Sequence, residues 1–213
     1  MDGMTTPEIE TLMFRLFDSS QKPLTCKFLG VFSFDHLPSL FRYETSSCCC
    51  IVNIDPSTKP GSHWVAFFFD SVLNSLEFFD SYGNPPSFFN FNIKLPDSSH
   101  PKPQLAYNAI PLQSLSTTVC GQYCILFCYF HAMLSSSPSA FNSTVSALSK
   151  LAPSKQARDF KIRFLVNHLV HSRSFLPASA LSYRIPSYRP ATHLQETSAF
   201  SQGSTCFLMS CAN

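Results

Sequence analysis

Charged residues are scarce in this sequence: Asp, Glu, Lys and Arg make up 13% of the 213 residues, whereas 45% are hydrophobic. This balance does not fit the composition of disordered proteins, and a chain of this length can bury a sizeable core. The formal net charge of +2 is too small to indicate by itself a protein that binds polyanions. We therefore expect one globular domain over residues 1–171, followed by a Ser- and Pro-rich tail over residues 172–213.

Long hydrophobic runs are also missing. The longest nearly continuous one, Tyr123 to Leu134, contains His131 and falls well short of the roughly 20 residues that a membrane helix needs. No cationic, hydrophobic signal peptide opens the sequence, and its nine cysteines are an odd number. We therefore expect a buried core helix at this run, no contact with a membrane, and reduced thiols in a cytosolic or nuclear setting.

Cys-x-x-Cys pairs, from which structural zinc sites are built, do not occur in the sequence. The run Cys48-Cys49-Cys50 lacks the two-residue gap of such a pair, and no matching pair follows it. It is better interpreted as small apolar residues on a strand. We therefore expect no metal site.

Apolar periodicity predicts helices on either side of a β-rich segment. Helices are expected at residues 7–17, 121–134, 140–151 and 155–170, and strands at residues 48–54, 64–69, 75–79 and 105–110. Near-continuous apolar runs such as Val65 to Phe69 are typical of strands that are covered on both faces, so helices should pack against the sheet.

Four residues stand in contexts that suit a thiol nucleophile site. Cys120 precedes a predicted helix, whose unpaired N–H groups would favour the thiolate. His63 precedes one strand and Asp80 ends the adjacent one, so the imidazole can take the thiol proton while the carboxylate orients it. Gln113, seven residues before Cys120, can donate to an oxyanion together with backbone N–H groups.

Each of these residues also has an ordinary role when it is taken alone. Free cysteines are among the most buried residues, which is how we interpret Cys124 and Cys128. A lone histidine is more often a surface or core residue, Asp80 opens a turn, and Gln113 suits a surface loop. The joint occurrence of all four in a workable order is what favours the catalytic interpretation.

Around these residues the sequence resembles the adenovirus-type cysteine endopeptidases, a family also encoded by large virus-like DNA transposons. The resemblance is carried by blocks that occur in the same order: Phe28-Leu29-Gly30, Cys50-Ile51-Val52-Asn53, Gly61-Ser62-His63-Trp64-Val65-Ala66-Phe67, Phe79-Asp80-Ser81-Tyr82-Gly83 and Cys120-Gly121-Gln122-Tyr123-Cys124. It covers roughly residues 7–170. It implies an α+β fold of the papain-like, adenovirus-protease type, with a central mixed sheet packed by helices.

The resemblance also implies the role of each site residue. It assigns the nucleophile to Cys120, the general base and acid to His63, the orienting carboxylate to Asp80, and the oxyanion hole to Gln113 and the backbone N–H of Cys120. Trp64 would shelter the imidazole, and Gly121 would leave the backbone open to a substrate carbonyl. No metal or cofactor is required for this chemistry.

The function implied is a cysteine endopeptidase that cleaves capsid or core precursor proteins, often after small residues such as Gly, during maturation of a virus or virus-like element. It would act as a monomer in the host nucleus and the virion. Peptidases that remove ubiquitin-like modifiers share the order His, Asp, Gln, Cys and are the alternative enzyme, although their Gln typically stands nearer the Cys than Gln113 stands to Cys120. An inactive protease fold that acts as a binding or scaffold module is the alternative from another class.

Two features bear on activators. Adenoviral members are activated by a peptide that forms a disulfide shortly before the oxyanion-hole Gln, yet residues 101–112 contain no cysteine, so covalent activation there is not expected. Those members are also stimulated by DNA. A modest basic cluster could serve that purpose or be a solvated helix face: Lys150, Lys155, Arg158, Lys161 and Arg163. An activating peptide and DNA are therefore partners that only the resemblance implies.

Overall fold

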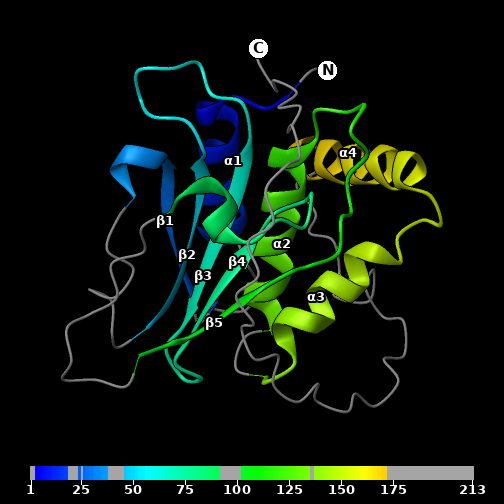
Figure 1. The fold of residues 1–213 in the computed structure, drawn as a ribbon. Helices are drawn as coiled ribbons and strands as arrows, with labels where there is room; N and C mark the ends of the chain where they lie inside the picture. The colour runs from blue at the N-terminus through cyan, green and yellow to red at the C-terminus, as the bar shows by residue number, and fades with distance from the viewer. Residues whose placement is uncertain are drawn as a thin grey trace, which may run out of the picture.

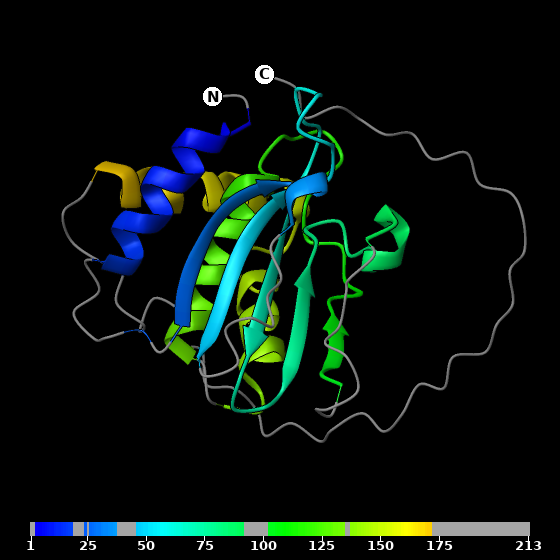
Figure 2. The ribbon, with the colours of Figure 1, turned by 90° about the vertical axis from the view of Figure 1, so that its left-hand side faces the viewer.

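Five strands form one mixed sheet in the order β1-β2-β3-β4-β5, in which the two outer pairs are parallel and the two inner pairs antiparallel (Figures 1 and 2). The structure is a computed structural model that describes residues 3–18, 24, 26–37, 46–91, 102–134 and 137–171. The strands are β1 (Cys26–Ser33), β2 (Ser47–Asn53), β3 (Trp64–Asp70), β4 (Ser75–Phe79) and β5 (Gln104–Tyr107). The expected tail over residues 172–213 lies outside the described residues.

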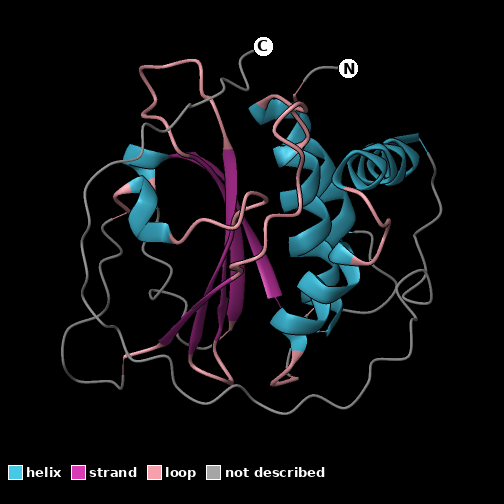
Figure 3. Ribbon diagram, turned by 45° about the vertical axis from the view of Figure 1, so that its right-hand side comes forward, coloured by secondary structure: helices cyan, strands magenta, loops and turns pink. Residues whose placement is uncertain are grey.

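Four α-helices accompany the sheet: α1 (Thr6–Asp18), α2 (Cys120–Leu134), α3 (Ala140–Ser149) and α4 (Lys155–His171). They lie on one face of it, whereas the short 3-10 helices η1 (Phe34–His36) and η3 (Pro86–Phe89) lie on the other (Figure 3). The α+β fold with a mixed sheet packed by helices, which the sequence predicts, is confirmed.

Alternation along the strands divides the core into two parts. Phe68 of β3 and Phe79 of β4 join the core that faces the four helices. Phe67 and Phe78, one position away, join a second core on the opposite face, where Phe89 of η3 packs against them. Because successive side chains of a strand point to opposite faces, both faces need a cover, and this explains the near-continuous apolar runs of β2 and β3.

Helix α2 lies at the centre of the larger core, and every residue from Cys120 to Ala132 is buried. The buried core helix predicted for this segment is therefore confirmed. A polar contact also joins α2 to the sheet, since His131 Nε2 lies against the carboxylate of Glu77 on β4. Within the described residues, no helix combines the length and hydrophobicity needed to cross a membrane.

One strand was missed from the sequence, and the end of another was predicted wrongly. Strand β1 was not predicted, because Gly30 adopts a φ of +131° and the pairing with β2 shifts register between Phe28 and Val31, which breaks the alternation. The strand expected at residues 105–110 ends at Tyr107. The next residue, Asn108, turns its side chain to the backbone of Asp80 instead of continuing the sheet.

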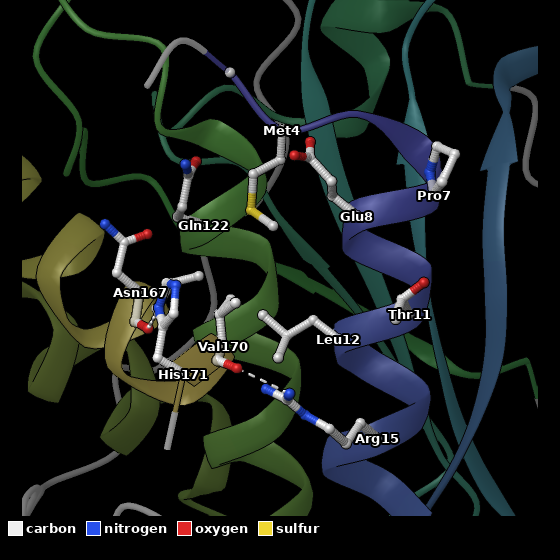
Figure 4. Close-up of a pocket in the computed structure, with 12 residues that line it drawn as sticks. Met4, Pro7, Glu8, Thr11, Leu12, Arg15, Gln122, Asn167, Val170 and His171 are labelled. Carbon is white, nitrogen blue, oxygen red and sulfur yellow. Dashed lines mark hydrogen bonds between the residues drawn. The ribbon is translucent and has the colours of Figure 1, made fainter. Parts of the chain in front are cut away.

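A cavity of about 420 Å³ lies between α1, the first turn of α2 and the last turns of α4 (Figure 4). Its lining includes Met4, Leu12 and Val170. Arg15 of α1 joins two of the walls, because its Nη1 donates to the carbonyl of Val170 at 2.9 Å. None of the four predicted catalytic residues is among those that line it.

Candidate active site

The β3–β4 hairpin brings His63 and Asp80 together. The two strands are antiparallel, with Ala66 opposite Phe79, so the residue before β3 and the residue after β4 meet at the same end of the sheet. His63 Nε2 and Asp80 Oδ1 are 2.6 Å apart, and both side chains are buried. Sequence reasoning anticipated this contact from the ends of two adjacent strands.

A dense set of donors holds the Asp80 carboxylate in place. Its Oδ1 also accepts from the backbone N–H of Tyr82 at 3.0 Å. Its Oδ2 accepts from the backbone N–H of Asn84 at 3.0 Å and from the side-chain amide of the same residue at 2.8 Å. The side chain of Asn108 clamps the Asp80 backbone, accepting from its N–H at 2.9 Å and donating to its carbonyl at 2.7 Å.

These contacts decide the charge of Asp80. Burial by itself would raise the pKa of this carboxyl group, but the hydrogen bond and positive charge of His63, together with the N–H groups of Tyr82 and Asn84, lower it below the ordinary value of 3.8. Asp80 is therefore a carboxylate at neutral pH. A carboxylate in this position fixes the tautomer of His63, because it accepts the proton on Nε2.

The free energy of unfolding should fall as the pH drops below about 4. The pKa of Asp80 is lower in the folded protein than in the unfolded chain, so its contribution is complete above the unfolded value and is lost as the pH falls through the folded one. Denaturant unfolding at a series of pH values measures this. Asp80→Asn should flatten the acid limb, and parallel curves for the two proteins would contradict the assignment.

The imidazole of His63 is in contact with aromatic rings. The ring of Tyr82 stacks on it with centroids 4.9 Å apart and planes at 28°, and Phe89 lies 6.0 Å away. Trp64, which was expected to shelter this ring, directly follows His63, and its indole Nε1 donates to the carbonyl of Met4 at 3.0 Å.

Cys120 is the first residue of α2 and is fully buried. The backbone N–H of Tyr123 bonds to the carbonyl of Val119 at 3.1 Å, so the N–H groups of residues 120–122 belong to the first turn of α2. Such groups stabilise a thiolate and a developing oxyanion. Because no surface of Cys120 is exposed, a substrate carbonyl can reach the sulfur only after a neighbouring group moves.

The start of α2 packs directly against the start of β3. A Cβ on Gly121 would lie 3.2 Å from Cδ1 of Trp64 and 3.1 Å from Cδ1 of Ile9, so only glycine fits there without displacing a neighbour. One turn later, Cys124 Sγ donates to the Trp64 carbonyl at 3.4 Å. Since Trp64 follows His63 and Gly121 follows Cys120, these contacts bring the helix start and the histidine to the same end of the sheet.

Gln113 is buried beside the turn that contains Asp80. Its backbone N–H bonds to the Ser81 carbonyl at 3.0 Å, and its Oε1 accepts from the Ser81 hydroxyl at 2.7 Å. Its Nε2 donates to the Thr117 carbonyl at 2.8 Å. The same nitrogen lies 3.5 Å from the hydroxyl oxygen of Thr117. An amide nitrogen carries two protons, so an oxyanion would compete only with this longer contact for the second one.

Most of the residues that support the site were missed from the sequence. Tyr82 belongs to one of the sequence blocks that carry the family resemblance, but no role was predicted for it. Asn84 follows Asp80 within the same turn, and this short spacing could have identified it. Asn108 is 28 positions from Asp80, and no local pattern points to it. Contacts over such distances appear only when the sheet is assembled.

Four other thiols of the core lack the properties of a nucleophile. Burial raises the pKa of Cys48 to about 12 and raises that of Cys49, Cys50 and Cys124 well above the ordinary value of 9.0. These groups stay protonated at neutral pH. Among the described residues, no cluster of His, Cys, Asp or Glu is arranged to hold a metal ion.

The basic cluster that could bind DNA contains fewer surface charges in the structure than the sequence suggests. Arg158 is buried and donates to three backbone carbonyls, those of Leu112, Ser149 and Ala152, so it is not a surface charge. Lys161 donates to the carbonyl of Leu151. The interpretation of these residues as one basic surface was therefore wrong for Arg158.

A cysteine at a helix start, at the sheet end that also holds a histidine–aspartate pair and a buried glutamine amide, defines the class of thiol-nucleophile sites. The chain belongs to a particular family within it, the adenovirus endoproteases, whose family model matches residues 28–189. The match extends past residue 171, where the domain was expected to end.

Individual relatives agree with this assignment. The chain is 28% identical over 127 residues to a protease of porcine adenovirus A serotype 3, a match that covers 54% of this chain and 61% of the relative. It is 26% identical over 138 residues to a protease of frog adenovirus 1, covering 60% of this chain and 67% of the relative. The matched part thus spans less than two thirds of the porcine virus protein.

Two solved structures are also similar. The crystal structure of an African swine fever virus protease has a TM-score of 0.47 and 20% identity, covering 76% of this chain and 66% of that one. The C-terminal Ulp1 protease domain in complex with Smt3, the yeast orthologue of SUMO, has a TM-score of 0.44 and 16% identity, and the match covers 78% of each chain. Both TM-scores lie below 0.5.

Proposed function

We propose that this protein is a cysteine endopeptidase in which Cys120 is the nucleophile, His63 the general base and acid, and Asp80 the orienting carboxylate. Gln113 and the backbone N–H of Cys120 form the oxyanion hole. The observation that supports this most strongly is the buried 2.6 Å contact between His63 and Asp80, at the sheet end where α2 begins with Cys120. Membership of the adenovirus endoprotease family supports the same reaction.

The mechanism follows from the two ring nitrogens of His63. Nε2 is held by Asp80, so Nδ1 is the nitrogen that takes the thiol proton. The Cys120 sulfur attacks the scissile carbonyl, and Gln113 and the helix-start N–H groups hold the oxyanion. His63 then gives its proton to the leaving amine, which leaves a thioester. His63 next takes a proton from water, which hydrolyses the thioester and restores the thiol.

The substrates we propose are capsid or core precursor proteins of a virus or virus-like element, processed in the host nucleus and the virion. The likeness to adenovirus proteases supports this choice. We propose DNA and an activating peptide as partners on the same ground, without a disulfide at residues 101–112. Removal of a ubiquitin-like modifier is the second candidate, because those peptidases share the chain order of His63, Asp80, Gln113 and Cys120.

One experiment separates these candidates. The full chain is incubated with candidate capsid precursors, with and without DNA, and the new termini are sequenced. In parallel it is treated with a ubiquitin-like modifier that carries a C-terminal electrophile. Precursor cleavage without modifier labelling is the expected result. Labelling without cleavage would favour the second candidate, and neither reaction would favour an inactive binding module.

Replacing Gln113 with alanine should lower kcat by roughly 10²–10³-fold, the typical cost of losing one oxyanion donor. The hydrogen bonds of this side chain go to Ser81 and Thr117, so its loss should leave the His63–Asp80 pair and the alkylation rate of Cys120 near those of the wild type. Steady-state kinetics and timed alkylation of the same preparation measure both quantities. An unchanged kcat would remove Gln113 from the oxyanion hole.

A further inference from the structure

Two consecutive charged residues of α4 hold the loop that carries Gln113. Arg158 and Asp159 are only 8% and 2% exposed, although they are charged and lie in the first turns of a helix. Their side chains contact residues 112–117, the segment between β5 and α2. A buried charge is costly unless it is fully hydrogen-bonded, so its presence here calls for a reason.

The Asp159 carboxylate joins three partners. Its Oδ2 accepts from the backbone N–H of Ser114 at 3.0 Å and from the Thr117 hydroxyl at 2.7 Å. Its Oδ1 accepts from the Tyr123 hydroxyl at 2.9 Å. Burial, together with the charge of Asp159, raises the pKa of Tyr123, so this hydroxyl keeps its proton and remains a donor. One carboxylate thus ties the loop to the first turn of the helix that Cys120 begins.

Arg158 fixes the other side of Gln113. Its Nη1 donates to the carbonyl of Leu112 at 2.8 Å, while Nε and Nη2 donate to the carbonyls of Ser149 and Ala152 at 3.0 and 3.1 Å. The residues immediately before and after Gln113 are therefore both anchored to α4. The backbone of the proposed oxyanion donor cannot shift unless these contacts break.

The orientation of the Gln113 amide depends on the same contacts. Its Nε2 donates to the carbonyl of Thr117, and the hydroxyl of that residue donates to Asp159. The Ser81 hydroxyl donates to the other end of the amide, Oε1. A flip of the amide would set Oε1 against the Thr117 carbonyl, acceptor facing acceptor, so Thr117 and Ser81 together determine where the N–H points.

We propose that Asp159 is a positioning residue for the oxyanion-binding amide of Gln113, and that it acts through Thr117 and Ser114. This inference rests on the proposed function. Asp159 does not touch the substrate in this account. Its effect comes from geometry, because an oxyanion donor works only when it lies 2.7–3.1 Å from the position that the charge will occupy, and a displacement of about 1 Å can cost 10²-fold in rate.

The first test is Asp159→Asn in the full chain. The substitution preserves the size of the side chain but replaces one acceptor oxygen with an NH₂ group. That group would face the N–H and hydroxyl donors that now bond to the carboxylate. We expect kcat per active site to fall about tenfold, a part of the roughly 10²–10³-fold cost of losing the donor itself. KM and the pH dependence of Cys120 alkylation should change little, since the His63–Asp80 pair is untouched. Titration with an irreversible thiol reagent counts the active sites.

Two comparisons separate positioning from a structural role. Ile162→Val on the same helix trims a fully buried side chain that belongs to the core, so it should reduce stability without changing kcat per active site. In the double variant Gln113→Ala with Asp159→Asn, the change at Asp159 should lower kcat by less than about a further twofold. Asp159 acts through the Gln113 amide, which this variant already lacks. A loss of kcat in the double variant equal to the product of the losses in the two single variants would overturn the inference.

Thr117 offers an independent variant should Asp159→Asn fail to fold. Thr117→Val removes the hydroxyl that links Asp159 to the Gln113 loop, and it should lower kcat per active site in the same direction. Thr117→Ser retains the hydroxyl and should restore the rate. An unchanged kcat per active site in Asp159→Asn or in Thr117→Val would overturn this inference alone. A wild-type protein without turnover would overturn the proposed function, and this inference with it.

Discussion

Replacing Cys120 with alanine should reduce turnover of a precursor substrate by about 10⁶-fold, to the background rate. The change removes the sulfur that would form the thioester, whereas the buried site and its polar contacts keep their shape. Turnover is followed by the appearance of new termini over long incubations. Residual activity well above background would mean that another group is the nucleophile.

A matched thiol provides the control for that experiment. Cys128 lies on the same helix, two turns after Cys120, and is also buried. Cys128→Ala removes a sulfur of the same kind from the same core and should retain wild-type turnover. Loss of activity in both variants would indicate that the helix tolerates no change, and the comparison would then carry no information on the nucleophile.

Replacing Asp80 with asparagine should have the second largest effect, a loss of up to about 10⁴-fold in kcat, as in other sites where a histidine is left in the wrong tautomer. Each carboxylate oxygen of Asp80 meets donors: His63 and the Tyr82 N–H at Oδ1, and two donors of Asn84 at Oδ2. An NH₂ group at either position opposes them. If it faces His63, the ring must carry its proton on Nδ1, which then cannot accept the proton of Cys120.

Kinetics of Asp80→Asn, per titrated active site, measure this effect. Asp70→Asn is the matched control, because Asp70 is equally buried and its Oδ1 caps a turn by accepting from the N–H groups of Val72 and Leu73. Asp70 ends β3, the strand that His63 precedes, and so lies at the opposite end of the sheet. Asp70→Asn should lower stability and leave kcat near wild type. Equal losses in the two variants would contradict a catalytic role for Asp80.

The part of the site that could be predicted from the sequence is the part that a single hairpin assembles. Strands β3 and β4 are apolar and are separated by a short turn, so their antiparallel pairing and the meeting of His63 with Asp80 follow from local pattern. The position of Cys120 at a helix start was equally local. These are the features for which neighbours in sequence are also neighbours in space.

Long-range contacts escaped prediction because no local pattern encodes them. Asp159 accepts a hydrogen bond from Thr117, which lies 42 positions earlier in the sequence. The helix that carries Asp159 also departs from the usual pattern of buried apolar and exposed charged side chains. Helix α4 buries Arg158 and Asp159 but leaves Phe160 and Phe164 74% and 61% exposed. Both interpretations of the basic cluster, as a DNA-binding surface and as a solvated helix face, therefore treated Arg158 as an exposed residue. The contacts of Trp64 are of the same kind, since they involve Gly121 and Met4, which lie far from it in the sequence.

The most direct test of the account is the rate at which Cys120 reacts with a small alkylating reagent near neutral pH, in the wild type and in His63→Ala. Peptide mapping separates Cys120 from Cys48, Cys49, Cys50 and Cys124, whose raised pKa values make them internal references. We predict that Cys120 reacts faster than a model thiol and that this advantage disappears in His63→Ala. A Cys120 that reacts no faster than a model thiol, or as fast without His63, would contradict the proposed nucleophile and base.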